Sequence, residues 1–146
     1  MSAETNKAIS RRWYEDLFNQ GNLAVADEIC AEDYANLEPY GPPGGWPVGP
    51  TGAKAVVATY RTAFPDLVFT VEEQIAEGQS VATRWTARGT QTGLLPGGIA
   101  PTGRLVAVTG ISVERYDGGK IVESRVNWDF FGMMQQLGVI PTPASA

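Results

Sequence analysis

The sequence predicts an α+β fold in which helices cover one face of an antiparallel sheet. In the first half of the chain, apolar residues recur every three or four positions, as they do on one face of a helix. From residue 67 onward they alternate with polar residues, which is typical of strands. Helices followed by a run of strands are the pattern of an α+β domain. A length of 146 residues fits one domain, spanning 1–146.

Three helices are expected before the strands begin. The first has apolar residues at i, i+4 and i+8 and ends at Gly21. The residues of this stripe are Ile9, Trp13 and Leu17. Asn22 is a favoured cap for a short second helix, and Thr51 is one for a third helix that ends at Pro65.

A loop rich in proline and glycine separates the second and third helices. Residues 39–52 contain five prolines and five glycines, which restrict the backbone without forming a regular element. Trp46 lies in this loop, where an indole can form a lid or pocket wall, or can cover the edge of the core. Residues 34–37, just before the loop, fit either a strand or the exit of a helix.

The second half predicts four strands rich in Val, Ile, Thr and aromatic residues. Their ranges are 67–76, 80–92, 104–116 and 121–128. Residues 77–79 and 117–119 have hairpin length, whereas the connection at 94–103 is longer. A short apolar helix starting near Phe130 should end at Gly138, and the tail 141–146 is expected to be disordered.

Composition excludes several classes of partner. A net charge of −5 argues against nucleic acid, because phosphate binding requires clustered Lys and Arg. No apolar run approaches the ~20 residues of a membrane span, and residues 1–7 are too polar for a secretion signal. The single cysteine, Cys30, excludes an internal disulfide and suits a reducing compartment. We therefore expect a cytoplasmic protein that binds neither nucleic acid nor membranes.

The chain contains no histidine. Nucleophile systems that pair Ser or Cys with His are therefore excluded, together with the commonest transition-metal ligand. Acid–base chemistry must use Asp, Glu, Tyr, Lys or Cys. The acidic pairs lack metal-ligand spacing, and no glycine loop resembles a phosphate cradle, so neither a metal nor another cofactor is expected.

Four segments resemble the SnoaL-like polyketide cyclase family, which has the nuclear transport factor 2-like fold. The most specific is the ending Asp-x-x-Gly-x-x-x-Gln-Leu-Gly at residues 129–138. The others are 84–93, the turn 101–103 and the segment 118–123, and the resemblance extends from about Ile9 to Val139. It implies a cone-shaped domain, with helices packed in the concave face of a curved antiparallel sheet around one apolar pocket. It also implies a homo-oligomer, most simply a dimer.

In the cyclases of this family, the aspartate of the closing motif is the general acid/base of an intramolecular aldol condensation. By position this role falls on Asp129, and the substrate would be a hydrophobic, aromatic polyketide-like molecule. Trp128 and Phe130 flank Asp129, and such an apolar setting would make the carboxylate a stronger base. The alternative is that Asp129 caps the C-terminal helix, since Asp is a favoured cap residue.

Further residues are candidates for substrate binding. Gln91 stands where many family members carry a histidine; it can bind a carbonyl but cannot exchange a proton. Asn127 shares a strand face with Asp129, and Trp128 and Trp46 are candidates for the pocket wall. Arg84 lies either in the pocket or on the outer face of the sheet, because alternation does not decide which face is which.

Other functions fit the same residues. An epoxide hydrolase of the limonene epoxide hydrolase type would use Arg84 and Asp129, but Thr86 stands where a second carboxylate would be needed. A polyketide-tailoring hydroxylase or isomerase could use the same Arg–Asp pair. The third class is a non-catalytic protein that binds hydrophobic ligands, in which Arg84 and Asp129 form only an ion pair.

Overall fold

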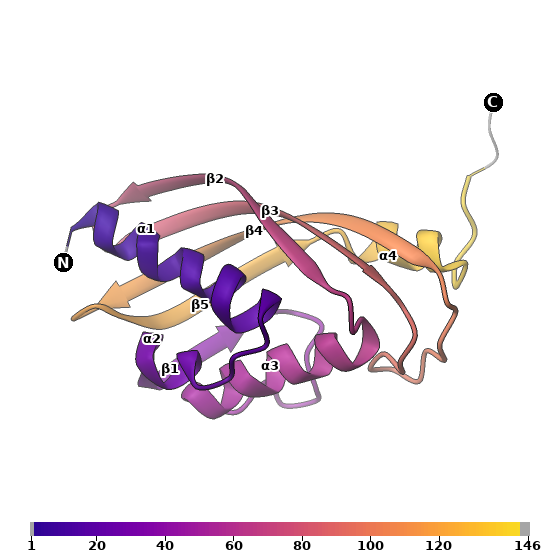
Figure 1. Cartoon of the computed structure of the whole chain (residues 1–146), viewed down its shortest axis with the longest axis horizontal. Coiled ribbons are helices and arrows are strands. Elements are labelled where there is room, and N and C mark those ends of the chain that lie inside the picture. Colours follow the sequence, from indigo (N-terminus) through magenta and orange to yellow (C-terminus); the bar gives the residue numbers. More distant parts are fainter. Residues whose placement is uncertain (1, 144–146) are drawn as a thin grey trace.

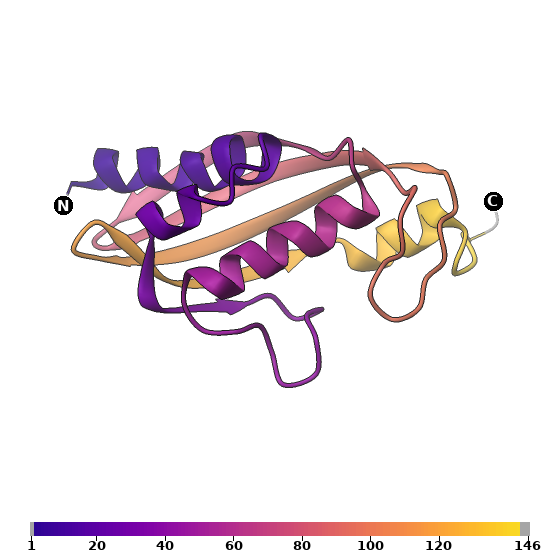
Figure 2. The ribbon, with the colours of Figure 1, turned by 60° about the horizontal axis from the view of Figure 1, so that its bottom comes forward.

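The structure is a computed structural model that describes residues 2–143, and it confirms the predicted α+β class. Figures 1 and 2 show a curved sheet with helices lying along its concave face. The elements, in chain order, are α1 (Ala3–Arg12), the π-helix η1 (Trp13–Asn19), α2 (Val25–Ile29), β1 (Cys30–Leu37), α3 (Pro50–Ala63), β2 (Val68–Glu77), β3 (Ser80–Thr90), β4 (Leu105–Asp117), β5 (Lys120–Trp128) and α4 (Phe130–Leu137).

The sheet has five strands in the order β1-β5-β4-β3-β2 and is not closed into a barrel. Strands β2 to β5 form the expected antiparallel meander. The sheet also contains a parallel pair that the sequence did not predict: residues 34–37, which fit either a strand or a helix exit, belong to a fifth strand, β1, that pairs with β5. Because this pairing is parallel, the carboxyl ends of β1 and β5 meet at the same edge of the sheet.

Helix α1 and η1 pack on β2 and β3, and α3 packs on β1. The alternation of inward and outward residues is clearest on β3. On β3, Val81, Thr83, Trp85 and Ala87 are buried, whereas Arg84 is exposed. This alternation defines an inner, helix-covered face and an outer face exposed in the monomer.

The π-helix widens the buried face of the first helical segment. Trp13, Tyr14, Leu17 and Phe18 are all buried, although they occupy two adjacent pairs along the chain. An α-helix would turn one member of each pair further from the core, whereas the wider π turn keeps both inside. Single π turns of this kind are frequent at functional sites.

Two predicted caps are replaced by other groups. Helix α3 begins at Pro50 after Gly49, so the expectation for Thr51 was wrong. Proline suits this first position because its missing N–H would have no partner there. Gly49 is required by close packing and a φ of 85°, since a Cβ would lie 2.7 Å from the Glu32 carbonyl oxygen. Asn22 supplies its backbone carbonyl to Val25 rather than its side chain.

The C-terminal helix ends as predicted, at Gly138 in the left-handed conformation with a φ of 76°. Residues 141–143 form neither helix nor strand, and the rest of the tail expected to be disordered, 144–146, lies outside the described residues. Within residues 2–143, none of the helices has the length and apolar character needed to cross a membrane.

Candidate functional site

A cavity lies between the helices and the inner face of the sheet, and its wall is mainly apolar. Its aromatic lining residues come from η1, α3 and four strand or loop positions. They are Trp13, Tyr14, Phe18, Tyr60, Phe64, Phe69, Trp85 and Trp128. The rings contact one another closely: the Phe69 centroid lies 4.6 Å from that of Phe18 and 4.9 Å from that of Trp85. Such a wall favours a planar, hydrophobic ligand.

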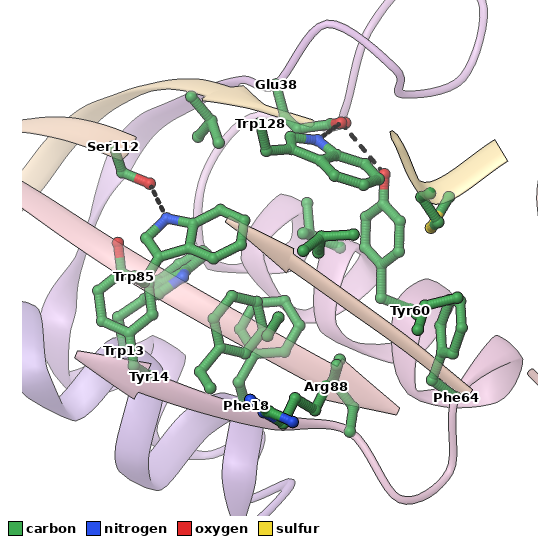
Figure 3. A pocket seen from close by; sticks show the side chains of 18 of the residues that line it. Trp13, Tyr14, Phe18, Glu38, Tyr60, Phe64, Trp85, Arg88, Ser112 and Trp128 are labelled. Carbon is green, nitrogen blue, oxygen red and sulfur yellow. Dashed lines mark hydrogen bonds between the residues drawn. The ribbon is translucent and has the colours of Figure 1, made fainter. Parts of the chain in front are cut away.

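Glu38 is the carboxylate that lines this cavity. It follows the last residue of β1 and is buried. Its Oε1 atom accepts hydrogen bonds from Trp128 Nε1 at 2.9 Å and from the Tyr60 hydroxyl at 3.1 Å. Its Oε2 atom accepts one from Trp46 Nε1 at 3.3 Å. Figure 3 shows Glu38, Trp128 and Tyr60 together on one side of the pocket.

All three donors to Glu38 are neutral, and within residues 2–143 no lysine or arginine forms an ion pair with it. Burial and the adjacent Glu38 charge raise the pKa of Tyr60 far above its usual value, so Tyr60 stays an O–H donor. The arrangement orients a carboxylate without neutralising it. Such a carboxylate is suited to accept a proton from a bound molecule.

A second polar group lies on the other side of the pocket (Figure 3). Trp85 Nε1 donates to Ser112 Oγ at 3.0 Å, and both residues line the cavity. The Tyr14 hydroxyl donates to Glu114 Oε1 at 3.1 Å, and Glu114 is buried behind the cavity wall. The hydrogen-bonded groups around Glu38 and around Ser112 thus form two clusters on different sides of the cavity. Arg88 and Asn36 also line the cavity, and within residues 2–143 Arg88 forms no ion pair with Glu38 or Glu114.

Of the residues predicted for the site, Trp128 lines the cavity as expected. Trp46 is not in the wall but reaches it through the hydrogen bond to Glu38. The predicted position of Asp129 in the pocket wall was wrong. Asp129 is exposed, and its Oδ1 atom accepts a hydrogen bond from the Gly132 N–H at 2.9 Å, which caps α4. Because the adjacent Trp128 points inward at the end of β5, Asp129 follows on the other side.

Arg84 and Asn127 lie on the outer face of the sheet and are exposed. Arg84 forms an ion pair with Glu73 at 3.3 Å. Of the two positions considered for Arg84, in the pocket or on the outer face of the sheet, the structure has the second. An Arg84–Asp129 pair is absent from the ion pairs within residues 2–143. Neither residue is placed to contact a ligand in the cavity.

Gln91 is fully buried but does not line the cavity. Its Nε2 atom donates to the carbonyls of Gly93, Ile99 and Ala100, and its Oε1 atom accepts from Thr102. Gln91 therefore ties down the long connection between β3 and β4. Gln91 is therefore not part of the cavity wall, where the predicted contact with substrate would need it.

Sequence reasoning missed Glu38, Tyr60 and the Tyr14–Glu114 pair as site residues. A signal existed for Glu114, because it occupies an inward position on β4, where the neighbouring inward residues are uncharged. An acidic residue at a core position requires a partner or a function. Glu38 gives no comparable signal, since it follows a strand whose existence was itself uncertain.

The family comparison matches the profile described as SnoaL-like polyketide cyclase over residues 8–137. The chain belongs to the SnoaL-like polyketide cyclase family. The match spans every helix and strand from η1 to α4, and it includes both polar clusters of the cavity. The predicted resemblance to this family is therefore confirmed, and the protein is of the general cyclase type.

Solved structures of similar proteins agree with this assignment. IdmH from Streptomyces antibioticus, provisionally assigned as a polyketide cyclase, is 31% identical, with a TM-score of 0.76 over 91% of this chain and 98% of that one. A protein from Acidithiobacillus ferrooxidans with the same provisional assignment is 29% identical, with a TM-score of 0.82 over 95% and 99%. TsrD from Streptomyces laurentii, at 21% identity and a TM-score of 0.85 over 96% and 99%, shows the same fold. None of the curated protein sequences matches the chain.

Proposed function

We propose that this protein is a cofactor-independent enzyme, of lyase or isomerase type, that removes a proton next to a carbonyl group in a hydrophobic, polyketide-like substrate. The reaction that fits the family is an intramolecular aldol cyclisation. The observation that carries the proposal is Glu38, a buried carboxylate that lines an apolar cavity and is oriented by three neutral donors.

In the proposed step, a Glu38 oxygen accepts the proton from the carbon next to the carbonyl. The electron pair of the broken C–H bond forms an enolate, whose carbon attacks a second carbonyl of the same molecule. One C–C bond forms, and the resulting alkoxide takes the proton back from Glu38, which regenerates the carboxylate. The step involves no change of oxidation state and needs no co-reactant. Tyr60, Trp128 and Trp46 fix the direction of the carboxylate.

Glu38 replaces Asp129 as the proposed base because of where the two carboxylates lie. A general base must come within hydrogen-bond reach of the proton it removes. Glu38 faces the cavity, whereas Asp129 is exposed and already caps α4. Asp129 can still support the site indirectly, since α4 carries Met133, which lines the cavity.

The cavity measures about 80 Å³, below the ~300–1,000 Å³ of typical ligand pockets. A polyketide-sized substrate must therefore displace part of the wall. Segment 38–49 forms neither helix nor strand and supplies Glu38 to the wall, and Tyr40 stacks from it on Phe130 with centroids 4.2 Å apart. We expect this segment to move when substrate enters.

The test is to incubate the protein in D₂O with a panel of linear poly-β-ketones, following deuterium exchange by NMR and cyclised product by mass spectrometry. Glu38→Gln should lower the rate by about 10²–10⁴-fold. Asp129→Asn should leave it nearly unchanged, because Asn also caps helices. The opposite result would return the role of base to Asp129. Ligand binding without exchange in the wild type would support the binding-protein alternative instead.

A further inference from the structure

The polar cluster opposite Glu38 has the composition of a group that binds a carbonyl oxygen. Tyr14 and Ser112 both line the cavity. The Ser112 oxygen already accepts a hydrogen bond from Trp85. Burial and the Glu114 charge raise the pKa of Tyr14 well above its usual value, and Ser112 acts in the opposite direction. The Tyr14 phenol thus lies at the cavity wall and has Ser112 and Glu114 as polar neighbours.

Glu114 is a fully buried carboxyl group with no cation beside it. It accepts hydrogen bonds from Tyr14 and from Ser10 of α1, and Ser10 in turn contacts Thr83 of β3. The other titratable groups that face it are the phenols of Tyr34 on β1 and Tyr116 on β4. Among residues 2–143, no lysine or arginine forms an ion pair with it.

An isolated carboxylate is costly to bury, so the neutral acid is the favoured form here. Burial raises the pKa of Glu114 to about 8, although the bonds from Tyr14 and Ser10 act in the opposite direction. Near neutral pH the group therefore carries a proton and becomes a donor. When Glu114 donates its O–H to the Tyr14 oxygen, the Tyr14 hydrogen is free to point elsewhere. Because Tyr14 lines the cavity, a molecule bound there can supply the acceptor.

We infer that Tyr14, supported by un-ionised Glu114, donates a hydrogen bond to the substrate carbonyl oxygen whose neighbouring proton is taken by Glu38. This inference rests on the proposed function. As the C–H bond breaks at Glu38, negative charge develops on that oxygen, and a fixed donor in an apolar site stabilises it. The Tyr14 proton stays on Tyr14 during the step. Tyr14 is then a catalytic residue, and Glu114 is a positioning residue that acts through it.

The geometry separates the two roles. Glu38 reaches the cavity from the end of β1, and Tyr14 reaches it from the π-helix on the other side (Figure 3). A base and a hydrogen-bond donor on opposite sides of one cavity can act on one carbonyl compound at the same time. Other enzymes also keep a carboxylic acid neutral in an apolar site so that it can donate a hydrogen bond at neutral pH.

The test uses 4-nitrophenolate, a small planar anion whose oxygen resembles that of an enolate, and nitrobenzene, which lacks the oxygen. Affinities are measured by titration calorimetry. Tyr14→Phe should weaken 4-nitrophenolate binding about 10- to 100-fold and leave nitrobenzene binding unchanged. Tyr116→Phe is the matched control, because it removes a buried phenol hydroxyl that does not line the cavity and has no close hydrogen bond within residues 2–143. It should change neither affinity.

The role of Glu114 is tested by pH and by the conservative variant. Wild-type affinity for 4-nitrophenolate should fall as the pH rises through about 8, when Glu114 ionises. Glu114→Gln keeps a neutral donor and should bind the anion as tightly as the wild type, but without this decrease. Glu114→Leu should bind it more weakly at every pH. A purely structural role would make the Gln and Leu variants lose nitrobenzene binding as well.

Equal affinity of Tyr14→Phe and wild type for 4-nitrophenolate, with nitrobenzene binding intact, would overturn the inference. A Glu114→Gln variant as weak as Tyr14→Phe would overturn the role of Glu114. These binding results do not depend on turnover. Glu38→Gln should leave anion binding undiminished while it lowers the rate of deuterium exchange by about 10²–10⁴-fold. A failure of Glu38 as the base would therefore be recognised separately.

Discussion

The indole of Trp128 donates a hydrogen bond to Glu38 at 2.9 Å, and this bond joins the carboxyl ends of β1 and β5. The two strands are parallel neighbours, so their ends lie at the same edge of the sheet. Tyr60 adds a second donor from α3 to the same carboxylate oxygen. Three elements that are distant in the sequence therefore meet at one acidic group in the cavity.

This relationship predicts the effect of removing one donor. Tyr60→Phe leaves the ring in the wall but deletes the hydroxyl at 3.1 Å from Glu38. Hydrogen bonds to charged groups contribute about 1.5–3 kcal/mol, so we expect at least a tenfold loss in kcat with a smaller change in KM. Tyr40→Phe is the control, since it deletes a hydroxyl that makes no hydrogen bond to any of residues 2–143. Equal activity of the two variants would show that orientation of Glu38 does not limit the reaction.

Replacing Gln91 should lower the stability of the protein rather than its catalytic activity. It is fully buried and holds five polar groups of the β3–β4 connection. Gln91→Ala leaves several of them without a partner, and we expect a decrease of about 2–4 kcal/mol in the free energy of unfolding. Urea unfolding measures this change. Arg84→Met removes only an exposed ion pair and should cost less than about 1 kcal/mol.

The sequence predicts the architecture well because periodicity and turns are local properties. The hairpins at 77–79 and 117–119 and the end of α4 at Gly138 all follow from nearby residues. The parallel pairing of β1 with β5 does not, since it depends on a contact across the whole chain. The site depends on that pairing, because it places Glu38 beside Trp128. The position of Asp129 could not be predicted either: its neighbours in the sequence are apolar, but its side chain is exposed and caps α4 rather than facing the cavity.

The outer face of the sheet predicts self-association. Ile75, Ala82 and Val113 lie in one row across β2, β3 and β4, and Ile75 and Val113 are exposed. Exposed Ile111 is next to them on β4, beside the Arg84–Glu73 pair. We expect a homodimer through this face in sedimentation experiments at micromolar concentration. Val113→Asp should shift it to the monomer, whereas Thr109→Asp, on the same face of β4 but away from this apolar row, should not. A wild-type monomer would contradict the expectation.

Glu114 also predicts how stability depends on pH. In the unfolded chain its carboxyl group loses its proton near pH 4.3, whereas in the folded protein it keeps the proton to about pH 8. Between these values the folded state binds one more proton than the unfolded state, so the stability that Glu114 provides falls as the pH rises. It is fully present below the lower value and lost by about pH 8. The slope from this one group is at most about 1.4 kcal/mol per pH unit.

Glu114→Gln isolates this effect, because Gln resembles the neutral acid and can still bond to Tyr14 and Ser10. The other titrating groups are common to both proteins, so they cancel in the difference. We expect the variant and the wild type to be similarly stable at about pH 4, and the wild type to become progressively less stable than the variant up to about pH 8. Denaturant unfolding at a series of pH values measures the difference. A constant difference across this range would mean that Glu114 is already ionised in the folded protein, and that Tyr14 remains bound to it rather than free to face the cavity.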